Sequence, residues 1–236
     1  MKILPYPERR VEIMRFVRRH HYTRRCPGVW TVAYGIENHR GDIQAVAVYG
    51  PPPYPSVTRA FIRRPEDAAR LIWQARLVGA GISAAALDDL IMFANHDLTG
   101  RGFWWVYTMT DPVSKVIDGG LLKLLTRGYS GEVYQRNSWQ YLGVAGSKRI
   151  EGFLVNGKPV HLRQGAVTLT LSNIHQHYPD ADIRVLRGNA KQRWVFVLGN
   201  SAERAERVLL MKYHVQPYEA LMQPRLLRNG ALICQS

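Results

Sequence analysis

The stretch Arg76-Leu-Val-Gly-Ala-Gly-Ile-Ser83 lies between a run typical of a strand, 72–78, and a run typical of a helix, 84–96. Glycines let backbone N–H groups approach phosphate oxygens closely, and a helix start adds the positive end of its dipole. Serine is a residue type that caps helices. Two glycines also occur at ordinary strand-to-helix turns, so the surrounding sequence has to decide between a ligand site and a plain turn. We predict a pyrophosphate cradle made by Arg76, Gly79, Gly81 and Ser83.

The stretch is similar to the acyl-CoA loop of GNAT-type acyltransferases, which follows the pattern Arg/Gln-x-x-Gly-x-Gly/Ala. The segments around it agree with that resemblance. An amphipathic helix over 7–22 is followed by the order β-β-β-α-β-α-β, over residues 29–36, 43–49, 72–78, 83–98, 103–109, 113–127 and 132–143. This order favours an α/β (α+β) protein with a GNAT-like acyltransferase fold and a mixed central sheet.

The sequence pattern changes after Gly143. Short strands with a turn at Asn156-Gly157 are followed by further strands over 183–188 and 194–198 and a basic helix over 201–213. No linker rich in serine, glycine and proline separates this part from the rest. We therefore predict a GNAT-like catalytic core over 1–146 and a β-rich C-terminal extension over 147–236 packed on the same core. A small second domain is the alternative.

The composition is strongly basic. Lysine and arginine number 32 against 18 acidic residues, which gives a net charge of +14 and a pI of about 10.1. Such an excess indicates a polyanionic partner, most often nucleic acid, although an anionic membrane surface would attract the same charge. No apolar run approaches the ~20 residues that span a bilayer, and no signal-peptide pattern is present. The two cysteines, Cys26 and Cys234, indicate neither a disulfide framework nor a structural zinc site. We expect a reduced, cytoplasmic protein with no membrane partner.

Three segments place polar and aromatic residues where sites usually form, at strand ends and in loops. In the first, His20-His21-Tyr22, the two histidines point about 100° apart on a helix and cannot easily share a metal, and a surface pair is the alternative. In the second, Asp111 follows a strand at the end where open α/β sheets bind ligands, although it also suits a helix N-cap. In the third, Tyr134 offers a phenol with an ordinary pKa near 10, which can protonate a leaving thiolate.

Taken in order, these segments resemble the phage Mom family of DNA adenine-modifying proteins. The matching pieces are His21-Tyr22, Gly35, Val48-Tyr49-Gly50-Pro51, Arg76-Leu77, Thr110-Asp111-Pro112, Gly131-x-x-Tyr134-Gln135-x-Asn137-x-Trp139-x-Tyr141-x-Gly143, Lys191-x-Arg193-x-Val195-Phe196-Val197-Leu198 and Pro217-Tyr218. The family is GNAT-like and acetyl-CoA-dependent. It converts the 6-amino group of adenine in double-stranded DNA to a carbamoylmethyl (acetamido) derivative, which protects phage DNA from host restriction, and an iron requirement has been proposed for it.

The resemblance implies a site for this chain, residue by residue. Its catalytic residues would be His21, Tyr22, Asp111 and Tyr134, and the first three of these would also be the iron ligands. DNA would be bound by Arg24, Arg25, Tyr49, Arg136 and Asn137. The target adenine would be turned out of the duplex and stacked on Trp30, Tyr49, Tyr54 or Trp139. The chain departs from many relatives in the helix over 113–127, which separates Asp111 from Tyr134.

Two other classes of function remain open. A plain GNAT acetyltransferase acting on a protein or small-molecule amine would explain the stretch 76–83 but neither the charge nor the aromatic block after Gly131. A non-catalytic DNA-binding protein would explain the charge but would leave the glycine cradle and the strand-end Asp111 without a role.

Overall fold

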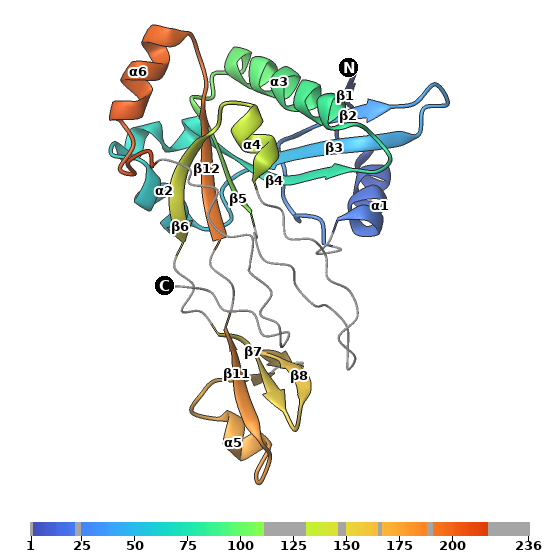
Figure 1. Cartoon of the computed structure of the whole chain (residues 1–236), viewed down its shortest axis with the longest axis vertical. Coiled ribbons are helices and arrows are strands. Elements are labelled where there is room, and N and C mark those ends of the chain that lie inside the picture. Colours follow the sequence, from blue (N-terminus) through green and yellow to red (C-terminus); the bar gives the residue numbers. More distant parts are fainter. Residues whose placement is uncertain are drawn as a thin grey trace, which may run out of the picture. The chain divides into compact units, whose positions relative to one another are not determined.

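The computed structural model describes residues 2–21, 25–110, 131–145, 150–164, 167–187 and 191–216. It divides into two compact units. The first contains the described parts of Met1–Met109, Gly131–Gly143 and Arg193–Gln223, and the second contains those of Thr110–Ser130, Val144–Gln192 and Pro224–Ser236. The predicted boundary at 146–147 falls on residues outside the described part. The chain from Arg193 on, which the sequence analysis placed in the extension, returns to the first unit (Figure 1).

The first unit is built on a seven-stranded sheet in the order β1-β2-β3-β4-β5-β12-β6. The strands are β1 (Lys2–Leu4), β2 (Val32–Glu37), β3 (Ile43–Gly50), β4 (Leu71–Gly79), β5 (Trp105–Thr110), β6 (Gln140–Ala145) and β12 (Lys191–Val197). Strands β1 to β4 are antiparallel neighbours, and β4 pairs with β5 in parallel. The predicted mixed α/β sheet is therefore confirmed.

Helices cover both faces of this sheet (Figure 1). The helix α1 (Arg10–His20) buries Ile13 and Val17 against one face, and α3 (Ala84–Gly100) buries Leu90 and Ile91 against the other. The remaining helices are α2 (Pro55–Phe61), the 3-10 helix η1 (Pro65–Arg70), α4 (Glu132–Arg136) and α6 (Ser201–Leu209). Of the helices within the described residues, none is both long and apolar enough to cross a membrane.

The strand predicted over 132–143 is wrong in its first half, where the chain forms the short helix α4. Gly131 has φ 77° and begins this helix, and a Cβ there would lie 2.5 Å from the ring of Trp194. Ser138 then turns the chain with φ 58°, and β6 begins at Gln140. Tyr134 and Trp139 resemble strand residues in the sequence, but here a helical turn buries them. The predicted helix over 113–127 lies outside the described residues.

The second unit contains a small sheet in the order β11-β7-β8 and a two-stranded pair of β9 and β10. Its elements are β7 (Ile150–Val155), β8 (Lys158–His161), β9 (Arg163–Gln164), β10 (Val167–Thr168), α5 (Ile174–His177) and β11 (Ile183–Arg187). The predicted turn at Asn156-Gly157 is confirmed, since it joins β7 to β8 with both residues at positive φ. Phe153, Leu169 and Ile174 belong to the unit's own apolar core.

Candidate functional site

Strands β4 and β5 separate in the middle of the sheet. Their pairing covers only Leu71–Trp73 against Trp105–Tyr107, while β4 continues to Gly79 and β5 to Thr110. The register of β4 with β3 shifts at this point, because Ala75 has no partner between Gln74 and Arg76. A bulge of this kind bends a strand and increases its twist. The bulge thus explains why β4 leaves β5 here, as Figure 1 shows.

The turn after β4 presents backbone N–H groups. Ala80 ties it to the sheet by donating its N–H to the Gln44 carbonyl oxygen at 2.9 Å. Gly81 follows with φ 70° and open space around it, and the Ser83 hydroxyl accepts from Ala86 N–H at 3.2 Å as the N-cap of α3. The predicted N-cap is therefore confirmed. Within the described part of the chain, the N–H groups of Gly81, Ile82 and Ser83 donate no hydrogen bond. Together with the positive end of the α3 dipole, they suit a phosphate group.

The sequence predicts that Arg76 belongs to the pyrophosphate cradle, whereas in the structure its side chain contacts the segment that follows α1. It is half-buried, and its Nε donates to the Arg25 carbonyl oxygen at 2.8 Å. This contact links β4 to the segment that follows α1. Whether Arg76 also contacts a phosphate stays a prediction.

A chain of three buried polar side chains lies where β4 leaves β5. The Tyr134 hydroxyl donates to Gln74 Oε1 at 2.6 Å, and Gln74 Nε2 donates to the Tyr49 hydroxyl at 2.8 Å. The Gln74 backbone carbonyl accepts from the Thr108 hydroxyl of β5 at 2.9 Å. Burial raises the pKa of Tyr49, so its phenol stays neutral at every physiological pH. A carboxamide has both an acceptor and a donor, which lets Gln74 hold two phenols in one orientation.

Helix α4 holds Tyr134 in place through contacts with α3. The Asp88 carboxylate accepts from Arg136 at 3.1 and 3.2 Å and from Asn137 Nδ2 at 2.8 Å. The Trp139 ring packs on Tyr134 with its centroid 4.8 Å away. Arg136 and Asn137, which the resemblance assigned to DNA, thus fasten α4 to α3 in this structure. That use was not visible in the sequence, because Asp88 lies more than forty residues away from both.

The Asp88 contact gives a testable prediction. Asp88→Ala removes the acceptor of both Arg136 and Asn137, so we expect a loss of about 1 kcal/mol in the free energy of unfolding and a lower kcat with an unchanged KM for the acyl donor. The matched control is Asp89→Ala, which removes an exposed carboxylate from the same helix. Thermal unfolding and steady-state kinetics of the two variants test this. Equal kcat values in the two variants would show that Asp88 does not position Tyr134.

His21 ends α1 and is half-buried. Burial first, and the charge of Arg76 second, lower the pKa of His21 to about 3, so its imidazole is neutral at pH 7. The other residues of the predicted site around it, Tyr22, Arg24 and Asp111, lie outside the described residues. Among the residues that are described, no group of three His, Cys, Asp or Glu side chains is placed to hold a metal. The iron ligand set of His21, Tyr22 and Asp111 stays a prediction.

The aromatic residues predicted to stack on a base differ in their exposure. Tyr49 is fully buried, and Trp30 and Trp139 are 3% and 5% exposed, so these three rings are too deep in the first unit to receive a base. The assignment of Tyr49 to DNA binding is therefore wrong, because its ring is in the core and its hydroxyl is bonded to Gln74. Tyr54 is 54% exposed, and Arg25 is also exposed.

No family model matches the chain, and no curated protein matches it. Several solved structures are similar to it. An aminoglycoside 6'-N-acetyltransferase complexed with coenzyme A has a TM-score of 0.47 and 11% sequence identity. The match covers 85% of this chain and 98% of the acetyltransferase chain. The GNAT family N-acetyltransferase YhbS from Escherichia coli, in complex with CoA, has a TM-score of 0.41 and 13% identity, covering 59% and 67%. An N-acetyltransferase from Staphylococcus aureus Mu50 has a TM-score of 0.36 and 12% identity, covering 71% and 68%. Likeness this distant assigns neither a family nor an activity.

Proposed function

We propose that this protein is an acyltransferase that binds acyl-CoA at the turn 79–83 and uses Tyr134 as its general acid. The observation that carries the proposal is the buried chain Tyr134–Gln74–Tyr49 at the bulge where β4 leaves β5. Strand β4, which contains Gln74, ends at the turn 79–83. One strand therefore connects the N–H groups proposed to bind phosphate with the residue that holds the Tyr134 phenol. The resemblance of the sequence to GNAT acyltransferases supports the same assignment.

The residues present fit an acyl-CoA. The N–H groups of Gly81, Ile82 and Ser83, which donate to no other described residue, precede a 17-residue helix and would hold its pyrophosphate. When bound, acetyl-CoA supplies an activated acyl group and a thiolate leaving group. Before the reaction the Tyr134 hydroxyl donates to Gln74 Oε1, and Tyr49 in turn fixes the carboxamide of Gln74. For the transfer, Tyr134 turns its O–H from Gln74 to the leaving thiolate and gives the thiolate its proton.

Titration calorimetry with acetyl-CoA tests this proposal directly. We expect saturable binding of one acetyl-CoA per chain, and we expect desulfo-CoA to compete for the same site because it keeps the pyrophosphate. If the protein is folded but calorimetry detects no binding of acetyl-CoA, the assignment is overturned. It would favour a protein that binds DNA without catalysis.

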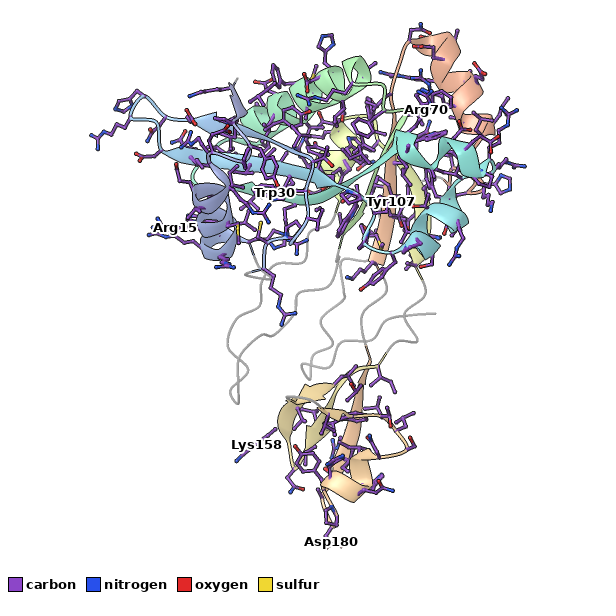
Figure 2. The ribbon with its side chains drawn as sticks, turned by 180° about the vertical axis from the view of Figure 1, so that it is seen from behind. Arg15, Trp30, Arg70, Tyr107, Lys158 and Asp180 are labelled. Carbon is purple, nitrogen blue, oxygen red and sulfur yellow. The ribbon has the colours of Figure 1, made fainter. Side chains whose placement is uncertain are left out.

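We further propose that the acceptor is the 6-amino group of adenine in double-stranded DNA, so that transfer of the acetyl group forms an amide at that nitrogen and releases CoA as its thiol. The net charge of +14 supports a polyanionic substrate. On α1, Arg15, Arg18 and Arg19 are exposed together, and Arg15 lies on the outer side of the helix in Figure 2. The resemblance to the Mom family supports adenine as the base.

The arginines of α1 provide a test of the DNA surface. If each of them neutralises one phosphate, replacing Arg15, Arg18 and Arg19 together by alanine makes the slope of log K against log salt shallower by about 0.9 for each phosphate concerned. The control replaces Arg40, Arg59 and Arg64, which are also exposed, and removes the same charge. DNA affinity measured over a range of salt concentrations gives both slopes. If the slope becomes shallower by the same amount in both variants, net charge and not the α1 surface determines DNA binding.

Mass spectrometry of nucleosides from DNA of cells that express the chain identifies the product. A deoxyadenosine heavier by one acetyl group supports the full proposal. A gain of one carbamoylmethyl group would mean the product that the resemblance implies, whose formation bonds the nitrogen to the acetyl methyl carbon and consumes a second nitrogen and a two-electron oxidant. Unmodified DNA, together with acetyl-CoA binding, would mean that the acceptor is a protein or small-molecule amine.

A further inference from the structure

One face of strand β5 changes from apolar to hydroxyl side chains at the point where β4 leaves it. Alternate residues of a strand share a face, so Val106, Thr108 and Thr110 lie together on the face of the sheet that α3 covers. Val106 lies within the paired part of the two strands, whereas Thr108 and Thr110 come after the last pair, Trp73 with Tyr107. The hydroxyls therefore begin where the backbone pairing stops.

The Thr108 hydroxyl joins the two strands beyond their last backbone pair. It donates to the Gln74 backbone carbonyl oxygen at 2.9 Å. Gln74 and Thr108 would be the next pair of the ladder, if the ladder continued. Paired strands lie about 4.8 Å apart and are joined by backbone N–H donors. A side-chain hydroxyl extends outward from its own backbone, so it can hold Gln74 after β4 has begun to leave β5.

Burial shows that this hydroxyl depends on its hydrogen bond. Thr108 is only 3% exposed. A buried hydroxyl destabilises a protein unless it is hydrogen-bonded, and valine has nearly the same shape and suits a strand equally well. The bond to Gln74 is thus the feature that distinguishes threonine from valine at this position. Thr110 provides a comparison, because its hydroxyl is equally buried but donates to Gln192 Oε1 of β12 at 3.1 Å, away from β4.

The position of the Gln74 backbone determines where its carboxamide lies. Both ladders of β4 are interrupted here, since the pairing with β5 stops before Gln74 and the register with β3 shifts directly after it. The Gln74 carboxamide accepts from the Tyr134 hydroxyl at 2.6 Å and donates to the Tyr49 hydroxyl at 2.8 Å. A displacement of the Gln74 backbone would therefore move the acceptor of the Tyr134 phenol.

We propose that Thr108 is a positioning residue for acyl transfer, and that its hydroxyl fixes the Gln74 backbone so that the carboxamide holds the Tyr134 phenol in one place. The inference rests on the proposed function, in which Tyr134 is the general acid, and adds to it a residue that acts only through Gln74. Misplacing a reacting group by about 1 Å can cost about 10²-fold in rate, so one buried hydrogen bond at this point affects kcat.

The kinetic test compares two substitutions of Thr108 with one of Thr110. Thr108→Val removes the hydroxyl and keeps the volume, and we expect kcat to fall roughly 10–100-fold. The Kd for acetyl-CoA should not change, because the turn 79–83 is untouched. Thr108→Ser keeps the hydroxyl and should restore most of the lost rate. Thr110→Val is the control, since it also removes a buried hydrogen bond from the same face of β5. The two valine variants should have similar melting temperatures, and only Thr108→Val should lose turnover.

A second measurement does not depend on turnover. The full chain is labelled with fluorotyrosine and examined by fluorine NMR, and the Tyr134 signal is identified as the one that disappears in Tyr134→Phe. We expect Thr108→Val to shift or broaden this signal, because the acceptor of the phenol has moved. Thr108→Ser should return the signal to its original place, and Thr110→Val should leave it there.

The two measurements together separate this inference from the proposed function. A displaced Tyr134 signal with a lower kcat, both reversed by serine, supports the inference. An unchanged signal in Thr108→Val overturns it. A loss of kcat that serine does not reverse, that Thr110→Val matches, or that accompanies weaker acetyl-CoA binding overturns it as well. A displaced signal with normal turnover supports the positioning of Tyr134 by Thr108 and shows instead that Tyr134 is not the general acid.

Discussion

Tyr134→Phe is expected to lower kcat by about 10²–10⁴-fold, the usual contribution of a positioned general acid. The substitution removes one hydroxyl and keeps the ring that packs on Trp139 at 4.8 Å. The affinity for acetyl-CoA should not change, because the phosphate contacts lie in the turn 79–83. Release of CoA thiol and nucleoside mass spectrometry measure the loss of turnover, and calorimetry measures the retained binding.

Loss of a buried hydroxyl also destabilises a protein, so the comparison needs a second tyrosine. Tyr34 is buried in the same sheet, and its hydroxyl donates to Asp97 Oδ2 at 2.7 Å. Tyr34→Phe removes one donor from Asp97 Oδ2, which keeps its bond to Arg101, whereas Tyr134→Phe removes the donor of the buried Gln74 Oε1. We expect a cost of about 1–3 kcal/mol in the free energy of unfolding for Tyr134→Phe and a smaller cost for Tyr34→Phe. Only the Tyr134 variant should lose turnover. Comparable kcat values in the two variants would remove Tyr134 from the chemistry.

Gly81→Val is expected to weaken acetyl-CoA binding by roughly 10–150-fold, the equivalent of losing about 1.5–3 kcal/mol of hydrogen bonding to a charged group. Gly81 has φ 70°, which a β-branched residue rarely adopts, although the space around its Cα is open. The expected effect is therefore a change of the backbone and not a clash. The N–H groups of residues 81–83 would no longer point toward one phosphate. Calorimetry measures the affinity.

Gly41→Val is the matched control for this change. Gly41 has φ 80°, is exposed, and also has nothing within 4 Å of a built Cβ, but it lies in the turn between β2 and β3. The two variants should lose similar stability, since both place a branched side chain at positive φ. Retained acetyl-CoA affinity in Gly41→Val and weakened affinity in Gly81→Val would locate the phosphates at the turn after β4. Unchanged affinity in both would exclude that turn as the binding site.

The features that depend on neighbouring residues were predictable from the sequence. The turn after β4 and its Ser83 cap follow from glycine and serine preferences within a few positions, and the Asn156-Gly157 hairpin follows from the same kind of rule. The helix α4 was not predicted, because its conformation depends on Gly131 fitting against Trp194, about sixty residues later. A prediction made from windows of about ten residues cannot detect a contact over this separation.

The site was predictable only in part. Tyr134 was found from its residue type and its place in the aromatic block. Gln74 was missed, although a single glutamine inside the apolar run from Leu71 to Val78 was a signal that could have indicated it. Tyr49 was misassigned, because exposure depends on packing between β3 and α3 and cannot be seen from the residue type alone. The predicted division of the chain failed to include β12 in the core, since strand order in a sheet is not encoded by spacing.

The position of β12 beside β6 has a consequence for how this chain can vary. The two strands are neighbours in the sheet, with Arg193 Nη2 donating to the Leu142 carbonyl oxygen at 2.9 Å, yet the described strands β7 to β11 come between them in the sequence. The elements β7 to β11 of the second unit are thus inserted between two adjacent strands of the seven-stranded sheet. The entropic cost of closing a loop rises only slowly with its length. The inserted elements can therefore be exchanged, shortened or enlarged while the seven-stranded sheet keeps its fold. Grafting a different small domain between β6 and β12 would preserve the turn 79–83 and Tyr134.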